Sequence, residues 1–204
     1  MRMSEFRWTM IVIVCALLAL YISWVGFIAS DDVSYFRGAE TWLSNPAFAG
    51  DDHWTTRFPV TISFAAFITI FGANFTAFAM MSVVWYSATI ALVGVVATAI
   101  GGWRAGWIAA LLAATTSIIV TNASIVNCDL PEAFLLLLGA FLVTRQSPLA
   151  SIAAGLSWGL AALSRETAVL ALAGLVPLFL IGRPLSRNRL LIAAAGVTDR
   201  KSVV

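Results

Sequence analysis

The sequence predicts an all-α polytopic membrane protein, with about six transmembrane helices and short juxtamembrane helices in a large outer loop, residues 31–74. Hydrophobic residues make up 61% of the chain, charged residues only 11%, and the mean hydropathy is +0.94. Ordinary soluble domains are about 45–50% apolar and about 25% charged. Nearly every polar residue falls in a short gap between apolar runs. This pattern excludes an ordinary soluble domain, and the chain has no basic patch for nucleic acid.

The first apolar run, Trp8–Ser30, predicts a retained transmembrane helix. It is longer than the core of a signal peptide, which needs about 7–15 apolar residues. The small residues at its end leave a cleaved signal peptide as the alternative. The segment after it predicts an amphipathic helix along the membrane surface, because apolar residues recur there at helical spacing: Tyr35, Ala39, Trp42 and Leu43.

The next apolar run, Phe58–Phe71, has only 14 residues, which make about 21 Å of helix. A hydrocarbon core of about 30 Å is thicker, so an interfacial or re-entrant helix is expected rather than a span. The later apolar runs predict five further spans, the first two separated by Gly101-Gly102: Phe75–Ile100, Ala105–Thr121, Leu130–Thr144, Leu149–Leu163 and Ala168–Ile181.

The distribution of arginines predicts a cytoplasmic N-terminus. If residues 58–71 do not span, the polar gaps after the later helices alternate between the two sides. The cytoplasmic gaps then contain Arg104, Arg145, Arg183, Arg187 and Arg189, as the positive-inside rule requires. Three arginines remain on the outer side, so the positive-inside rule does not explain their positions: Arg37, Arg57 and Arg165.

The chain divides into residues 1–198, one transmembrane domain, and residues 199–204, which read DRKSVV. That hexapeptide is what a common short-read sequencing adapter encodes in one reading frame, so we expect a non-native tail and a natural protein that continues further. The alternative is an ordinary exposed basic terminus.

Acidic residues at helix ends are the first candidates for chemistry. Asp31 and Asp32 follow the first span, where one carboxylate would serve as a helix N-cap and the second is not required. Two close carboxylates raise one another's pKa, which suits a general base or a metal site. Asp129, with Pro131 at the first helical position and Glu132 in the first turn, also fits an N-cap.

Arginines near these carboxylates are the second group of candidates. Arg57 precedes Pro59 at the predicted interface and could hold a phosphate with its forked donors, or simply extend to the membrane surface. Arg165 and Glu166 could pair with each other. Jointly, all these residues fall on the outer side at helix ends around one potential cleft, and ionisable residues so placed are functional candidates. Cys15 and Cys128 fit no metal spacing.

Four segments resemble the N-terminal portion of membrane glycosyltransferases of the GT-C fold: SDDVSYFRGAETWL, TRFPVTISFAAFITIFG, NCDLPEAFLLLLGAFLV and GLSWGLAALSRETAVLALAGLVPLFLI. The resemblance is to bacterial relatives of dolichyl-phosphate-mannose protein mannosyltransferases and of aminoarabinose transferases. It covers about residues 8–182 and rests on the order and spacing of the motifs.

The resemblance implies that a sugar moves from a polyprenyl-phosphate carrier to an acceptor on the outer face of a bacterial inner membrane. It implies Asp31 as the general base, with Asp32 in the catalytic group as a supporting carboxylate or cap, where the family often has Glu. Arg57 falls near the family's basic residue, although Arg57-Phe58-Pro59 replaces the usual Arg/Lys-Pro-Pro. The implied substrate-binding residues are Tyr35, Arg57, Asp129, Arg165 and Glu166.

The expected partners are the polyprenyl-phosphate sugar donor, a lipid, glycan or protein acceptor, and membrane lipids. No cofactor is expected, although a divalent metal stays open because oligosaccharyltransferases use one. The alternatives are a non-catalytic membrane subunit and a transporter fragment. A transporter would place charges or broken helices near mid-membrane, whereas the charges here lie at the ends of the spans.

Overall fold

The computed structural model describes residues 3–28, 30–45, 52–145 and 147–181, and all regular secondary structure in these ranges is helical. The helices are α1 (Met3–Ile22), α2 (Asp31–Ser44), α3 (Phe58–Phe71), α4 (Phe75–Thr115), α5 (Ser117–Ala123), α6 (Asp129–Val143), α7 (Pro148–Ser164) and α8 (Ala168–Ile181). The predicted all-α class is confirmed. The tail 199–204 and three of the predicted cytoplasmic arginines, Arg183, Arg187 and Arg189, lie outside the described residues.

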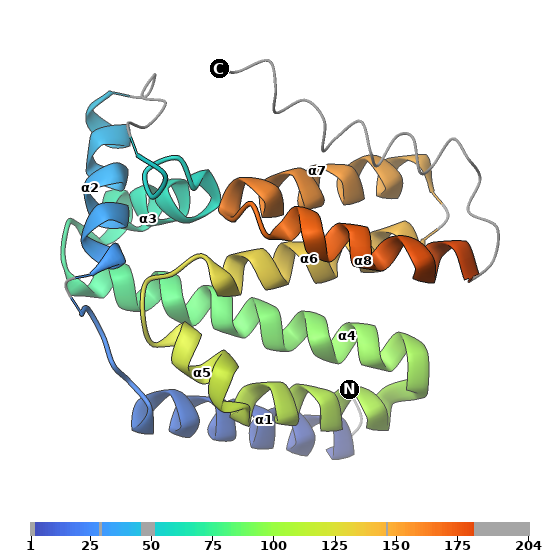
Figure 1. The fold of residues 1–204 in the computed structure, drawn as a ribbon. Helices are drawn as coiled ribbons and strands as arrows, with labels where there is room; N and C mark the ends of the chain where they lie inside the picture. The colour runs from blue at the N-terminus through green and yellow to red at the C-terminus, as the bar shows by residue number, and fades with distance from the viewer. Residues whose placement is uncertain (1–2, 29, 46–51, 146, 182–204) are drawn as a thin grey trace.

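The long helices lie side by side in a bundle, with α2 and α3 at one end (Figure 1). At that end α1 and α7 finish and α4, α6 and α8 begin, and we call it the site end. At the opposite end lie the start of α1, the turn within α4 and the α6–α7 connection. This second end contains Arg7, Arg104 and Arg145, and we call it the arginine end.

The α4 helix folds back on itself within its 41 residues (Figure 1). Gly102 has φ 80° and ψ 177°, which only glycine adopts readily, so the break predicted at Gly101-Gly102 is confirmed. The two halves then run antiparallel and pack closely. Tyr86 in the first half donates its hydroxyl hydrogen bond to the Ala114 carbonyl in the second half at 2.5 Å.

Most predicted boundaries agree with the helices to within one or two residues, and the surface helix after Asp31 is present as α2. Two predictions differ. The predicted span Ala105–Thr121 is not one helix, because α4 ends at Thr115, Thr116 is extended, and the short helix α5 begins at Ser117.

The first run also ends early, because α1 ends at Ile22 rather than at Ser30. Beyond it, Gly26 adopts φ +84° and donates its N–H to the Ser124 carbonyl at 2.8 Å. This contact between distant segments turns the chain away from the helix axis towards α2.

One helix among the described residues, α4, is long and apolar enough to cross a membrane by length and composition. The apolar part of α1 (Arg7–Ile22), α3 and α7 are shorter. The predicted number of about six spans is therefore not confirmed by the helix lengths. The connections nevertheless alternate between the two ends of the bundle, in the order that the arginine distribution predicts (Figure 1).

Candidate functional site

A chain of polar contacts at the site end joins α2, α3, α6 and α7. Arg57 donates Nη1–H bonds to the Tyr35 hydroxyl and to Cys128 Sγ, the second at 3.4 Å. The Cys128 thiol in turn faces Asp129 Oδ1 at 3.8 Å. Arg165 Nη1 bonds the same Asp129 oxygen at 2.5 Å. Two guanidinium groups and one carboxylate are thus linked through side chains that are up to 130 residues apart in sequence.

Arg57 takes its position from a short turn that precedes α3. In that turn Asp52 Oδ1 accepts the N–H groups of Trp54 and Thr55 at 2.9 and 2.8 Å. Arg57 is the residue immediately before α3, and Pro59 occupies the first turn, where a missing N–H costs nothing. The side chain lies inward against Tyr35, not outward along the membrane surface.

The Tyr35 ring is buried, with 1% of its surface exposed, and its hydroxyl accepts the Arg57 bond. Burial raises the pKa of Tyr35 above its ordinary value, against the opposing effect of Arg57, so the group stays a neutral phenol. Burial alone would lower the pKa of Arg57, but the Tyr35 bond and Cys128 raise it overall. Arg57 is therefore a held, permanently charged cation. Tyr35 positions the Arg57 guanidinium by accepting its hydrogen bond, and a direct contact of Tyr35 with substrate stays a prediction.

The antiparallel packing of α6 and α7 brings Asp129 and Arg165 together. Asp129 is the first residue of α6, and Arg165 immediately follows α7. The predicted N-cap at Asp129 is wrong by one residue, because Cys128 is the cap and Pro131 is the third helical residue. The predicted alternative that Arg165 pairs with Glu166 is also wrong, since its ion pair is with Asp129. Glu166 is exposed and is among the groups that raise the pKa of Arg57.

The two adjacent aspartates have different environments. Asp32 is 2% exposed, and its carboxylate accepts the N–H groups of Ile28 and Ser30 at 2.6 Å and of Val33 at 3.0 Å. These bonds hold the entry to α2, whose N-cap is Ser30 and neither aspartate. The carboxylate of Asp32 thus has a structural role, because it fixes the backbone at the start of α2, and its part in catalysis stays a prediction.

Asp31 is exposed and is the first residue of α2. It precedes Tyr35 by four residues, so the two share a helix face about 6 Å apart along the axis. Within the described residues, no hydrogen bond or ion pair joins the Asp31 side chain to the Arg57–Asp129–Arg165 contacts. The structure places Asp31 at the site end with an accessible carboxylate, and its role as the base stays a prediction.

Three residues of this region were not predicted: Cys128, Glu132 and Thr167. The Thr167 hydroxyl donates to Glu132 Oε1 at 3.4 Å, a second link between the start of α6 and the segment after α7. The motif NCDLPE could have indicated Cys128 and Glu132, because residues that flank a candidate carboxylate at a helix start share its surroundings. Thr167 directly follows the candidate residues Arg165 and Glu166. In the ranges that the structure describes, no three His, Cys, Asp or Glu side chains gather closely enough to hold one metal ion.

The family model for dolichyl-phosphate-mannose-protein mannosyltransferase matches residues 58–197, more than half of the chain. Helices α1 and α2, with Asp31, Asp32 and Tyr35, precede the matched part. No curated protein and no solved structure matches the chain. Members of the family are membrane-embedded glycosyltransferases that in general use a lipid-linked sugar donor. The predicted resemblance is confirmed, and the chain belongs to the dolichyl-phosphate-mannose-protein mannosyltransferase family.

Proposed function

We propose that this protein transfers a sugar from a polyprenyl-phosphate-linked donor to a hydroxyl of a lipid, glycan or protein acceptor at the outer face of a bacterial inner membrane. The observation that supports this most is the fixed position of the Arg57 guanidinium, which donates a hydrogen bond to the buried Tyr35 hydroxyl. Contacts through Cys128 and Asp129 link it to a second guanidinium, that of Arg165. Forked guanidinium donors suit phosphate oxygens, and two of them here lie among acidic groups at one end of a membrane bundle.

In the proposed reaction the Asp31 carboxylate takes the proton of the acceptor hydroxyl as its oxygen attacks the anomeric carbon. The bond from that carbon to the phosphate oxygen breaks, and the phosphate leaves with the electron pair. Arg57 and Arg165 stabilise the charge that develops on the phosphate. A single displacement from the opposite face inverts the anomeric configuration. Asp32 supports the reaction by fixing the backbone around the start of α2, where Asp31 is the first residue.

The proposed side of the membrane follows from the charge at the two ends of the bundle. The elements at the arginine end contain Arg7, Arg104 and Arg145, and the positive-inside rule assigns this end to the cytoplasm. The site end then faces outward, where a lipid-linked donor presents its phosphate at the surface. The proposed N-terminus is cytoplasmic.

The experiment that tests the proposal compares Asp31→Asn with Glu40→Gln, a matched loss of an exposed carboxylate on the same helix. Each purified variant is reconstituted in lipid vesicles, with polyprenyl-phosphate-mannose and an acceptor bearing free hydroxyls. Asp31→Asn should lower kcat by about 10²–10⁴, the usual contribution of a general base, with little change in donor binding. Glu40→Gln should leave kcat unchanged.

Two results would count against the proposal. Full transfer by Asp31→Asn would show that another group is the base. Donor binding without transfer by the unaltered chain, across donors that differ in sugar, would favour the alternative of a non-catalytic membrane subunit. Arg57→Gln should raise the donor KM several-fold or more and also lower kcat, because Arg57 is proposed both to bind the phosphate and to stabilise the charge that develops on it.

A further inference from the structure

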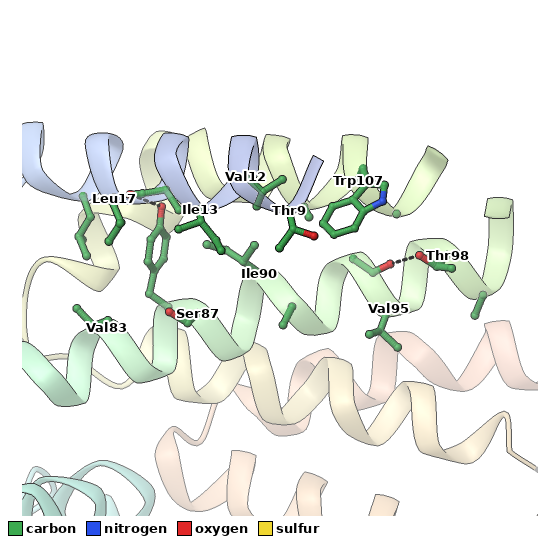
Figure 2. A pocket seen from close by; sticks show the side chains of 18 of the residues that line it. Thr9, Val12, Ile13, Leu17, Val83, Ser87, Ile90, Val95, Thr98 and Trp107 are labelled. Atoms are coloured by element: carbon green, nitrogen blue, oxygen red, sulfur yellow. Dashed lines mark hydrogen bonds between the residues drawn. The ribbon is translucent and has the colours of Figure 1, made fainter. Parts of the chain in front are cut away.

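A groove of about 760 Å³ lies between α1 and the two halves of α4, away from the site-end contacts. Figure 2 shows Val12 and Ile13 of α1 pointing towards the first half of α4, which contributes Ile90, with Trp107 of the second half at one side. This volume falls within the range of about 300–1,000 Å³ that small-molecule sites occupy. The groove is thus large enough for a ligand, and it is bounded by packed helices on more than one side.

The groove is long and almost entirely apolar. Its lining on the first half of α4 extends from Val83 to Ala99, which is about 24 Å of helix. Two of its polar groups are bonded to the backbone: Thr98 donates to the Gly94 carbonyl at 2.7 Å, and Tyr86 donates to the Ala114 carbonyl. A polar ligand would find few partners in such a groove, whereas a hydrocarbon chain would fill it favourably.

One charged residue, Arg145, lines the groove, and it lies at the arginine end. Its guanidinium carbon is 4.3 Å from the centre of the Phe141 ring, a cation–π contact that keeps the side chain at the arginine end of the groove. In the described parts of the chain Arg145 forms no ion pair, so its donors are open to an external anion. Arg104 at the same end lies over Trp103 and does not line the groove.

We propose that this groove holds an acyl chain of an anionic phospholipid, with the lipid phosphate bound by Arg145. The chain belongs to a membrane-embedded family, so bilayer lipid is the most abundant apolar molecule that reaches the groove. A phosphate with no neighbouring ammonium group complements a single arginine, whose fork binds phosphate oxygens in pairs. The Arg145 end of the groove lies about 22 Å, the length of α6, from Asp129, and none of the proposed sugar-transfer residues lines the groove.

The test measures lipid retention, which does not depend on glycosyl transfer. The purified chain in mild detergent is incubated with equimolar phosphatidylglycerol and phosphatidylcholine of identical acyl chains, and bound lipid is counted by native mass spectrometry. The unaltered chain should retain one phosphatidylglycerol with a preference of about fivefold, the factor expected for one cation near a lipid headgroup. Arg145→Gln should abolish the preference, Arg145→Lys should keep most of it, and Arg104→Gln should leave it unchanged.

A second pair of variants tests the groove itself. Ala91→Phe places a ring in the groove and should lower retention of both lipids, whereas Leu170→Phe, on the exposed face of α8, should not. The proposal is overturned if the unaltered chain shows no preference, if Arg104→Gln and Arg145→Gln reduce it equally, or if Ala91→Phe retains both lipids normally. Helical content and a single gel-filtration peak are required of every variant, and the lysine variant remains informative if the glutamine variant aggregates.

Discussion

A single methyl group added at Gly139 should separate the two helices that carry Asp129 and Arg165. Gly139 faces α7 in the middle of α6, and a Cβ built on it would lie 2.3 Å from Trp158 Nε1 and 2.4 Å from Trp158 Cδ1. Ordinary contacts of a Cβ begin near 3.4 Å, so the ring or the helix must move by about 1 Å. The indole is rigid and 7% exposed, and it donates to the Leu136 carbonyl at 3.3 Å.

The cost of Gly139→Ala follows from three contributions. Overpacking a close interface costs about 1–3 kcal/mol. Displacing the indole from the Leu136 carbonyl adds about 1 kcal/mol for the lost hydrogen bond. Alanine regains about 1 kcal/mol over glycine in helix propensity. The net loss is about 1–3 kcal/mol, and 2 kcal/mol corresponds to a fall of about 4–8 °C in Tm for a chain of this size.

The assay is the apparent Tm in mild detergent, followed by gel filtration after heating. Gly174→Ala on α8 is the matched control, because among the described residues no atom beyond its own helix turn lies within 4 Å of its added Cβ. In a Trp158→Leu background the collision is absent, so Gly139→Ala should cost no more than the control. An unchanged Tm for Gly139→Ala in the native background would refute this account of the α6–α7 interface.

Three further predictions concern the site, the α4 turn and the buried thiol. Tyr35→Phe removes the acceptor of the Arg57 hydrogen bond. Because Arg57 is half-buried and water can replace the hydroxyl, we expect a several-fold rise in the donor KM and a smaller effect on kcat. An unchanged KM would contradict the positioning role of Tyr35. Gly102→Ala forces alanine into φ +80° and ψ 177° and should cost about 1–3 kcal/mol, measured as a lower Tm; a neutral result would mean that the turn can relax. Burial raises the pKa of the Cys128 thiol above its ordinary value, so in a Cys15→Ser background iodoacetamide should react slowly at neutral pH and faster as the pH rises beyond the range in which an ordinary thiol ionises. The Arg57 charge opposes that rise, so Arg57→Gln should shift the labelling profile to still higher pH, and a profile that moves the other way would contradict the contact.

Long apolar runs, and the polar or glycine residues that interrupt them, predicted most of the helices. Phe58–Phe71 and Ala168–Ile181 are helices with the predicted ends, and the break at Gly101-Gly102 is present. These features are local, since apolar composition favours helix and a glycine pair interrupts it. The early end of α1 was not predictable in this way, because it depends on the bond from Gly26 to Ser124, nearly a hundred residues away.

The sequence by itself determined that this protein is helical and apolar, and its motif order was enough to identify the family. Only the tertiary structure decided which charged helix ends meet. The different burial of Asp31 and Asp32 depends on it too, because successive helical residues point about 100° apart, which turns one carboxylate into the protein and the other towards solvent. The partner of Arg165 likewise depends on how α7 packs against α6, a long-range contact that leaves no periodic signal in the chain.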